Sequence, residues 1–132
     1  MLYRFDTEVP LRWVDVDSAG VVNNATYLSL AEQARWVYFS ELGLLRDHQL
    51  PFVLAEAKVQ FLQPGRLGMP VAVAAATTEL GNSSFKMSFE VRTGEQVLAK
   101  VDAVLVFVGE DMKSCPIPDD FRAVVAQFEE LS

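Results

Sequence analysis

Apolar residues recur at helical spacing between about Asn24 and Leu42, and this stretch predicts the longest element of the chain. Its apolar positions lie three and four residues apart, which places them on one face of an α-helix. They are Tyr27, Leu28, Leu30, Ala31, Ala34, Val37, Tyr38 and Leu42. An asparagine can cap the start of this helix, and Gly43 can end it. Because Trp36 and Phe39 widen the apolar stripe until little polar surface is left, we expect the helix to be buried.

The second half of the chain alternates between apolar and polar residues, a pattern typical of half-buried strands. Residues 85–93 alternate throughout, with Phe85, Met87, Phe89 and Val91 on one face. Residues 54–62 place Ala55, Ala57, Val59 and Phe61 on one face in the same way. Residues 70–80 begin apolar on both faces, as a central strand does, and residues 96–109 form a long strand. The pattern therefore predicts four strands after the helix.

The two ends of the chain add two further elements. Residues 3–14 alternate roughly and contain Pro10, which suits an edge strand or a bulged strand. Residues 119–131 predict a short helix with Asp119 or Asp120 near its start.

The order of these elements predicts a fold class. Short turns, PGRLG at 64–68 and GNSS at 81–84, lie between the later strands. Strands joined by short turns run antiparallel to their neighbours, and a sheet of this size needs one face covered. We therefore expect one α+β domain over residues 1–132, in which an antiparallel sheet of five to six strands wraps around one long central helix.

Composition excludes several classes of protein. With 132 residues, of which 51% are hydrophobic, the chain can bury a core. Its formal net charge of -7 and its scattered cations argue against a nucleic-acid partner. We find no run long enough for a membrane span and no signal peptide. Cys115 is the single cysteine, so no disulfide framework is possible within the chain, and we expect a cytoplasmic protein.

The segment DVDSAGVVNNATY (residues 15–27) places a carboxylate just ahead of a helix start. Asp17 precedes a turn, Gly20 permits a close approach of the backbone, and Asn24 begins the predicted helix. A carboxylate can attack a substrate or deprotonate water, and the free N–H groups of a helix start can bind an oxyanion. Alternatively, Asp17 is a turn or capping residue, since Asp side chains often bond nearby N–H groups.

Two further interpretations of this segment concern Asp15 and a possible calcium site. We expect Asp15 to be structural and to pair with the backbone or with Arg12. A calcium-binding EF-hand loop is excluded, because Ala19 stands where the third oxygen ligand is needed and Thr26 where the closing Glu is needed.

The order of elements and the segment RWVDVDSAGVVNNATYL...EQAR resemble the hotdog-fold acyl-CoA thioesterases of the 4-hydroxybenzoyl-CoA thioesterase type. The opening motif of that family is commonly an Arg–aromatic pair, Asp-x-Asp-x-x-Gly, an apolar pair and then the helix. The later segments GNSSF, VFV and PIP are also similar. The resemblance implies hydrolysis of acyl-CoA or aroyl-CoA thioesters to the free acid and CoA. It assigns Asp17 as base or nucleophile and the backbone N–H of Asn24 as the oxyanion donor.

The resemblance also implies how substrate is held and how copies assemble. Gly20 is expected to bind substrate, and Tyr27 either lines the acyl pocket or packs in the core. Ser83 and Ser84 are turn residues or lie near the pantetheine or phosphates of CoA. The phosphate-binding cations stay open among Lys58, Arg66, Lys86 and Arg92. No metal and no cofactor beyond the CoA of the substrate are expected. The family forms dimers or tetramers with the active site at the subunit junction, so we expect a homodimer or homotetramer.

One departure from the family concerns substrate class. Many relatives have His-Val after the glycine, where this chain has Val21 and Val22. The aryl-CoA branches of the family carry an aliphatic residue there, so the departure bears on the acyl group that is accepted.

Alternatives remain at the level of residues and of function. Glu32 is a rival carboxylate, because another hotdog branch uses a helical Glu. Alternatively, it forms an ion pair with Arg35 at i+3 or is a buried acid with its hydrogen bonds satisfied. His48, the sole histidine, is expected to be a loop residue, and no G-x-S-x-G motif is present. The other candidate functions are a hydratase or dehydratase, which would need a His in the motif, and a non-catalytic module that binds acyl thioesters.

Overall fold

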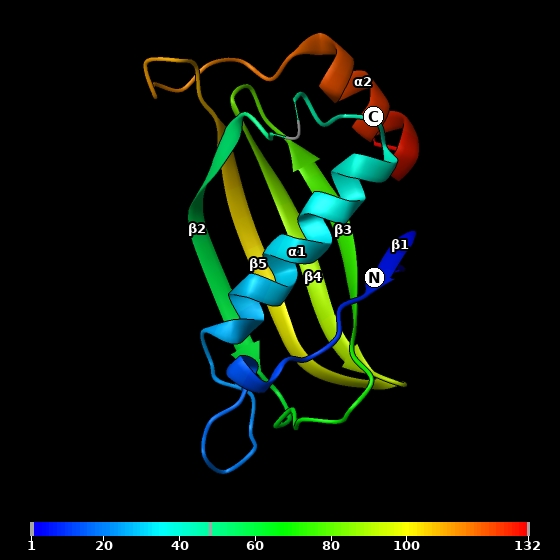
Figure 1. Cartoon of the computed structure of the whole chain (residues 1–132). Helices are drawn as coiled ribbons and strands as arrows, with labels where there is room; N and C mark the ends of the chain where they lie inside the picture. The colour runs from blue at the N-terminus through cyan, green and yellow to red at the C-terminus, as the bar shows by residue number, and fades with distance from the viewer. Residues whose placement is uncertain (1, 48, 132) are drawn as a thin grey trace.

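The computed structural model describes residues 2–47 and 49–131, within which five strands and two α-helices occur (Figure 1). A single 3-10 turn, Trp13–Asp15, follows the first strand. The elements are β1 Phe5–Glu8, α1 Thr26–Glu41, β2 Phe52–Phe61, β3 Ala72–Leu80, β4 Ser84–Thr93, β5 Gln96–Phe107 and α2 Asp119–Glu129. The predicted helices and the predicted strands are therefore all present.

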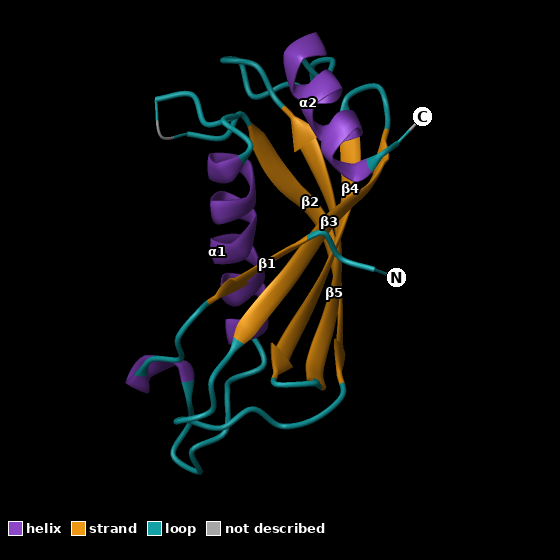
Figure 2. Cartoon of the chain, turned by 90° about the vertical axis from the view of Figure 1, so that its right-hand side faces the viewer, coloured by secondary structure: helices purple, strands orange, loops and turns teal. Residues whose placement is uncertain are grey.

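The five strands form one antiparallel sheet in the order β1-β3-β4-β5-β2. Figures 1 and 2 show α1 lying across one face of this sheet, with α2 at the end where α1 stops. The expected α+β architecture, an antiparallel sheet around one long helix, is confirmed with five strands.

One neighbour relationship differs from the prediction. Consecutive strands pair from β3 to β5, but β2 and β3 lie apart because β2 pairs with β5 and β3 pairs with β1. The segment between them is not a hairpin turn. Its backbone bonds the loop that precedes α1 instead: Val22 N–H donates to Gly65 O at 2.8 Å, and Leu67 N–H donates to Gly20 O at 3.3 Å.

Two strands also depart from strict alternation. In β2 the register shifts between Leu54 and Glu56, so Ala55 is a bulge residue, whereas Ala57 and Phe61 share a face as predicted. The first strand ends at Glu8 and is an edge strand, as Pro10 indicated. Pro10 has no N–H to donate, and the last bond of this stretch runs from Val9 N–H to Val71 O at 3.0 Å.

The central helix begins later than predicted and is covered on one face only. It starts at Thr26 after a turn, and no side chain caps it, so the expected asparagine cap is wrong. Gly43 has φ +74 and ends the helix as expected. The face toward the sheet is buried, but Trp36 and Leu28 are 41% and 37% exposed on the opposite face. A second surface is therefore needed to cover α1 fully.

The core lies between α1 and the sheet and is closed at one end by α2. Rings of five phenylalanines pack there edge to face or tilted, with centroids 4.7 to 6.3 Å apart. They are Phe39, Phe52, Phe85, Phe107 and Phe121. No helix within the described residues is long and apolar enough to cross a membrane.

Candidate active site

The loop that carries Asp17 is a small hairpin ahead of α1. Val16 bridges Val22, Asp17 N–H donates to Val21 O at 2.8 Å, and Gly20 N–H donates to Asp17 O at 2.9 Å. Gly20 has φ +76, a conformation that favours glycine and that reverses the chain here. The hairpin thus folds Asp17 back beside Val21, close in the chain to the start of the helix.

The carboxylate of Asp17 is exposed and is held by its own loop. Its Oδ1 accepts the N–H of Ala19 at 2.9 Å and the N–H of Val21 at 3.1 Å. This is the turn-stabilising arrangement that the sequence allowed as an alternative. It leaves Oδ2 without a hydrogen bond to any described residue, so the side chain is oriented by one oxygen and available through the other.

The opening of α1 supplies unpartnered backbone donors. Thr26 N–H donates to Asn23 O at 2.9 Å, and Asn23 N–H donates to Asp15 O at 2.9 Å. Between these positions, the N–H groups of Asn24 and Ala25 donate to no acceptor among the residues that the structure describes. They lie at the positive end of the helix, where an anionic oxygen is stabilised. The sequence predicted the Asn24 amide, and the structure adds the amide of Ala25.

Asp15 is structural, as expected. Its side chain is buried, and it accepts the backbone N–H of Arg12 at 2.8 Å and a guanidinium N–H of Arg12 at 3.0 Å. Hydrogen bonding to the Arg12 side chain lowers the pKa of Asp15, although burial opposes this shift. The pair fixes the 3-10 turn ahead of the hairpin.

A small cavity opens beside the start of α1. It has a volume of about 240 Å³. Apolar side chains from the hairpin and from the end of β2 surround it, together with Asn24. The lining residues are Val21, Val22, Asn24, Tyr27, Phe61, Leu62, Gln63 and Pro64. Tyr27 therefore lines a cavity beside the helix start, and its hydroxyl is already engaged, because it accepts the Gly65 N–H at 3.2 Å.

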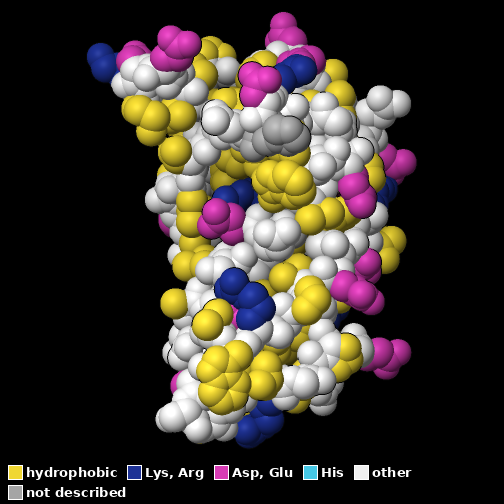
Figure 3. Space-filling model, viewed as in Figure 1, with side chains coloured by type: hydrophobic (Ala, Val, Ile, Leu, Met, Phe, Trp, Pro, Cys, Tyr) yellow, Lys and Arg dark blue, Asp and Glu magenta, His cyan; other side chains and the backbone are white. Residues whose placement is uncertain are grey.

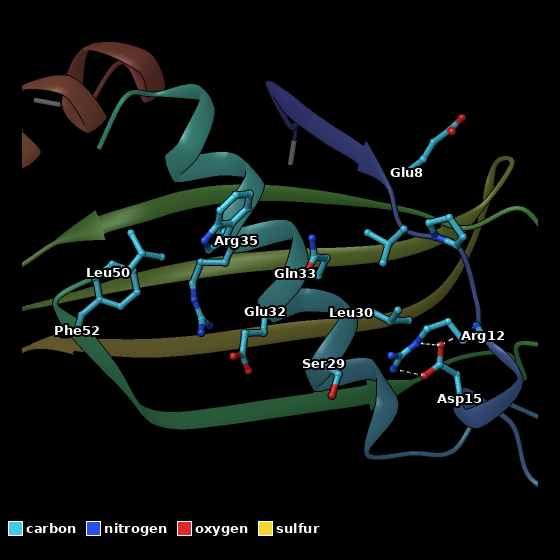
Figure 4. Close-up of a pocket in the computed structure, with 13 residues that line it drawn as sticks. Glu8, Arg12, Asp15, Ser29, Leu30, Glu32, Gln33, Arg35, Leu50 and Phe52 are labelled. Carbon is cyan, nitrogen blue, oxygen red and sulfur yellow. Dashed lines mark hydrogen bonds and ion pairs between the residues drawn. The ribbon is translucent and has the colours of Figure 1, made fainter. Parts of the chain in front are cut away.

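A larger groove of about 700 Å³ runs along the exposed face of α1. Figure 3 shows hydrophobic side chains and both signs of charge on this face. In Figure 4 the Arg12–Asp15 pair lies at one end of the groove and Leu50 and Phe52 lie at the other, with Glu32 and Arg35 from α1 between them. Asp17 lines neither this groove nor the smaller cavity.

The expected ion pair between Glu32 and Arg35 is not formed. No salt bridge joins them among the described residues, and Glu32 is exposed. The Arg35 guanidinium lies instead over the ring of Phe52, 5.8 Å from its centroid. Its Nε is buried without an acceptor, and burial lowers the pKa of this guanidinium. Arg35 was not singled out by the sequence as a site residue, because nothing local shows that its partner is an aromatic ring.

Ser83 and Ser84 do not share the site with Asp17 within one chain. They lie in and just after the β3–β4 turn, whose backbone bonds residues near α2: Ile117 N–H donates to Asn82 O at 2.9 Å. Figure 1 places this turn at the end of the sheet opposite to the start of α1. Gly20, Asn24 and Tyr27, by contrast, gather with Asp17 around the hairpin and the opening of α1.

The candidate cations have different surroundings. Lys86 pairs with Glu79 at 3.4 Å, Arg92 pairs with Glu90 at 2.8 Å, and Lys58 lies in register with Asp102. Arg66 is exposed and bridges Val21 of the hairpin through its backbone.

The sole histidine, His48, lies outside the described residues, so its expected place in a loop stays a prediction. Within residues 2–47 and 49–131, no group of three or more His, Cys, Asp and Glu side chains is placed to hold a metal ion.

Comparisons with known proteins show the family of the chain. The family model of the thioesterase-like superfamily matches residues 11–125. The acyl-CoA thioester hydrolase YbgC of Escherichia coli O6:H1 is 26% identical to the chain, and the match covers 96% of each sequence. The long-chain acyl-CoA thioesterase FadM of Escherichia coli K12 is 24% identical, over 82% of this chain and 84% of that protein.

Solved structures extend the likeness to the whole fold. A thioesterase from Thermus thermophilus, complexed with coenzyme A and Zn, superposes with a TM-score of 0.87 at 34% identity, over 97% of this chain and 96% of its own. The gentisyl-coenzyme A thioesterase BH1999 has a TM-score of 0.82 at 25% identity, over 92% of this chain and 99% of its own.

Proposed function

The chain belongs to the thioesterase-like superfamily and is a thioester hydrolase of the hotdog fold, and we propose that Asp17 is its catalytic carboxylate. The proposed substrates are acyl-CoA or aroyl-CoA thioesters, the substrate types named for the relatives YbgC, FadM and BH1999. One observation carries the assignment of the site. The hairpin presents a carboxylate with a free oxygen just ahead of two unpartnered amides at a helix start.

Asp17 supplies the attacking oxygen in either of two ways. Its Oδ2 can attack the thioester carbon, which releases CoA thiolate and leaves an anhydride that water then cleaves. Alternatively, it takes a proton from a water molecule whose oxygen attacks the same carbon. Both routes yield the free acid and CoA. The two N–H bonds to Oδ1 hold the carboxylate in one orientation, so that little side-chain freedom is lost in the reaction.

The amides of Asn24 and Ala25 stabilise the carbonyl oxygen as it gains charge. They need no rearrangement for this task, because the helix start already leaves them without partners. One oxyanion donor of this kind typically contributes roughly 10²–10³ in rate.

Arg66 is the proposed contact for the phosphates of CoA. Lys86 and Arg92 form ion pairs, and Lys58 lies in register with Asp102. Arg66 forms no salt bridge within the described part of the chain and is in register with no acidic residue of a strand. It also lies beside the hairpin that carries Asp17. A planar guanidinium suits phosphate oxygens, which it can bind through two N–H groups at once.

A second copy of the chain completes the proposed site. Within the described residues of one copy, Asp17 lines neither of the two cavities above, β2 has one edge without a partner strand, and the outer face of α1 exposes Trp36. Antiparallel pairing of two β2 edges would cover the unpaired edge. It would also invert the second copy, so that its β3–β4 turn lies at the same end as the first copy's helix start (Figure 1). Ser83 and Ser84 would then approach the substrate from the neighbouring subunit.

A panel of acyl- and aroyl-CoA thioesters, followed by release of free thiol, tests this proposal. We expect cleavage by the wild type and a fall in kcat of roughly 10³-fold or more for Asp17→Asn, which keeps the shape but loses the attacking charge. Asp6→Asn, an exposed aspartate on β1, is the matched control and should retain activity. The proposal fails if no thioester is cleaved or if Asp17→Asn is as fast as the wild type. Loss of enoyl-CoA absorbance without thiol release would indicate a hydratase instead.

A further inference from the structure

The opening of α1 is bound from one side by the 3-10 turn. The carbonyl oxygen of Asp15 accepts the Asn23 N–H at 2.9 Å and the Thr26 hydroxyl at 3.3 Å. These two bonds lie on either side of residues 24 and 25, which carry the unpartnered amides.

It is bound from the other side by one residue of the β2–β3 connection. Gly65 O accepts the Val22 N–H at 2.8 Å, and Gly65 N–H donates to the Tyr27 hydroxyl at 3.2 Å. We call these two bonds the Gly65 clamp. It joins positions 22 and 27, so it also spans the two amides, although it comes from a distant part of the chain.

The clamp is tightly packed. A Cβ at residue 65 would lie 2.9 Å from Cγ2 of Val22 and 3.1 Å from the Tyr27 oxygen, so a glycine permits the approach. Tyr27 is 3% exposed, and its ring packs edge to face on Phe61 with centroids 5.7 Å apart. The tyrosine is therefore fixed at both ends, by the packing of its ring and by the N–H that its oxygen binds.

From this geometry we propose that Tyr27 is a positioning residue, whose hydroxyl holds Gly65 and thereby sets the direction of the Asn24 and Ala25 N–H groups. This inference rests on the proposed hydrolysis at the start of α1. It gives Tyr27 a role other than contact with the acyl group. Oxyanion donors stabilise the transition state when their N–H groups point at its charged oxygen, and a misplacement of about 1 Å can cost about 10² in rate.

Tyr27→Phe removes the phenol oxygen and keeps the ring, so it tests the clamp without emptying the core. Because the amides contribute more to the charged transition state than to the bound thioester, we expect kcat to fall about tenfold or more. For the same reason, KM should change by less than about twofold. Amide hydrogen exchange at Gly65 should become faster, since its N–H loses its acceptor.

Tyr38→Phe is the matched control. Tyr38 is also buried on α1 and its hydroxyl is also hydrogen-bonded, but it donates to Glu129 at 2.6 Å near the far end of the helix. We expect Tyr38→Phe to lower the unfolding temperature and to leave kcat within about twofold of the wild type.

Three results would overturn the proposal for Tyr27. One is a raised KM with unchanged kcat, which would mean that the hydroxyl binds substrate directly. The second is wild-type kinetics in Tyr27→Phe, and the third is an equal loss of kcat in Tyr38→Phe. If the wild type cleaves no thioester, the proposed hydrolysis fails instead. In that case the exchange rate at Gly65 still tests the clamp, and unchanged exchange in Tyr27→Phe refutes it.

Discussion

Asp15 and Asp17 are separated by one residue and have opposite surroundings. Asp15 is buried and uses both carboxylate oxygens on Arg12, whereas Asp17 is exposed and keeps Oδ2 free of bonds to the described residues. The fully bonded carboxylate is suited to hold the loop, and the half-bonded one is suited to react. The 3-10 turn that ends at Asp15 and the hairpin that starts at Val16 place the two side chains in these different surroundings.

The role of Asp15 predicts a pH dependence of stability. Its pKa is lowered in the folded state, so its stabilisation is fully present above the ordinary value of 3.8 and is lost as the pH falls through the lowered value. Asp15→Asn should therefore be less stable than the wild type in urea unfolding at pH 7. The difference should shrink steadily below about pH 4. A difference that stays constant down to about pH 2 would contradict the assignment, and Asp6→Asn should show little difference at either pH.

At the scale of single residues, the sequence identified those parts of the site that are close together in the chain. Asp17, Gly20, Asn24 and Tyr27 all fall within one short motif. Gly65 was taken only as a turn residue, because its partners at 22 and 27 become neighbours only in the fold.

Among the elements, α2 is anchored by one buried carboxylate. Oε2 of Glu129 accepts the Tyr38 hydroxyl at 2.6 Å and the Thr77 N–H at 2.7 Å, and so joins α2 to α1 and β3. Burial, followed by the bond to Glu129, raises the pKa of Tyr38 far above its usual range, so the phenol stays a donor. The Thr77 N–H belongs to β3 beyond the residues that β1 covers, and Glu129 takes the place of a strand partner there.

Removing this carboxylate should loosen α2. Glu129→Ala leaves the buried Thr77 N–H without its acceptor, at a cost of about 1–3 kcal/mol, whereas the Tyr38 hydroxyl keeps the Thr77 hydroxyl as a partner at 3.1 Å. We expect the free energy of unfolding, measured in urea, to fall by at least that amount. Gln127→Ala, an exposed change on the same helix, should stay within about 0.5 kcal/mol of the wild type. Equal effects of the two changes would refute the anchoring role of Glu129.

Local periodicity predicted whether each element is a helix or a strand, but it did not predict which elements lie next to one another. Alternation and helical spacing are short-range signals, and they located the strands and both helices. The pairing of β2 with β5, the bulge at Ala55 and the late start of α1 depend on contacts between distant segments. Such contacts leave no periodic trace in the sequence.

For the molecule as a whole, one side of the fold is left uncovered. The groove on α1 is lined by Arg35 and Trp36, and the Nε of Arg35 has no acceptor among the described residues. One edge of β2 has no partner strand in the described chain. An exposed strand edge beside an apolar helix face is the usual signature of an interface. The proposed dimer pairs the two β2 edges in one symmetric contact.

The proposed dimer predicts the mass of the protein in solution and a position at which a charged residue should disrupt assembly. Light scattering should give at least twice the 14.7 kDa of one chain for the wild type. Leu54→Glu, at an exposed residue of the edge strand β2, should shift the protein toward monomer and lower kcat/KM, because it places a charge in the interface. Leu2→Glu, at a residue that is 88% exposed, should change neither. A fully active wild-type monomer would contradict the proposal that the site needs a second copy.

The central claim is that Asp17 and the amides at the start of α1 face the same thioester carbonyl. A crystal structure of Asp17→Asn with an uncleaved aroyl-CoA measures this directly. We expect the carbonyl oxygen at about 3 Å from the Asn24 or Ala25 nitrogen, with the side chain at position 17 against the carbonyl carbon. A thioester bound elsewhere, or a side chain at position 17 turned away from it, would contradict the account.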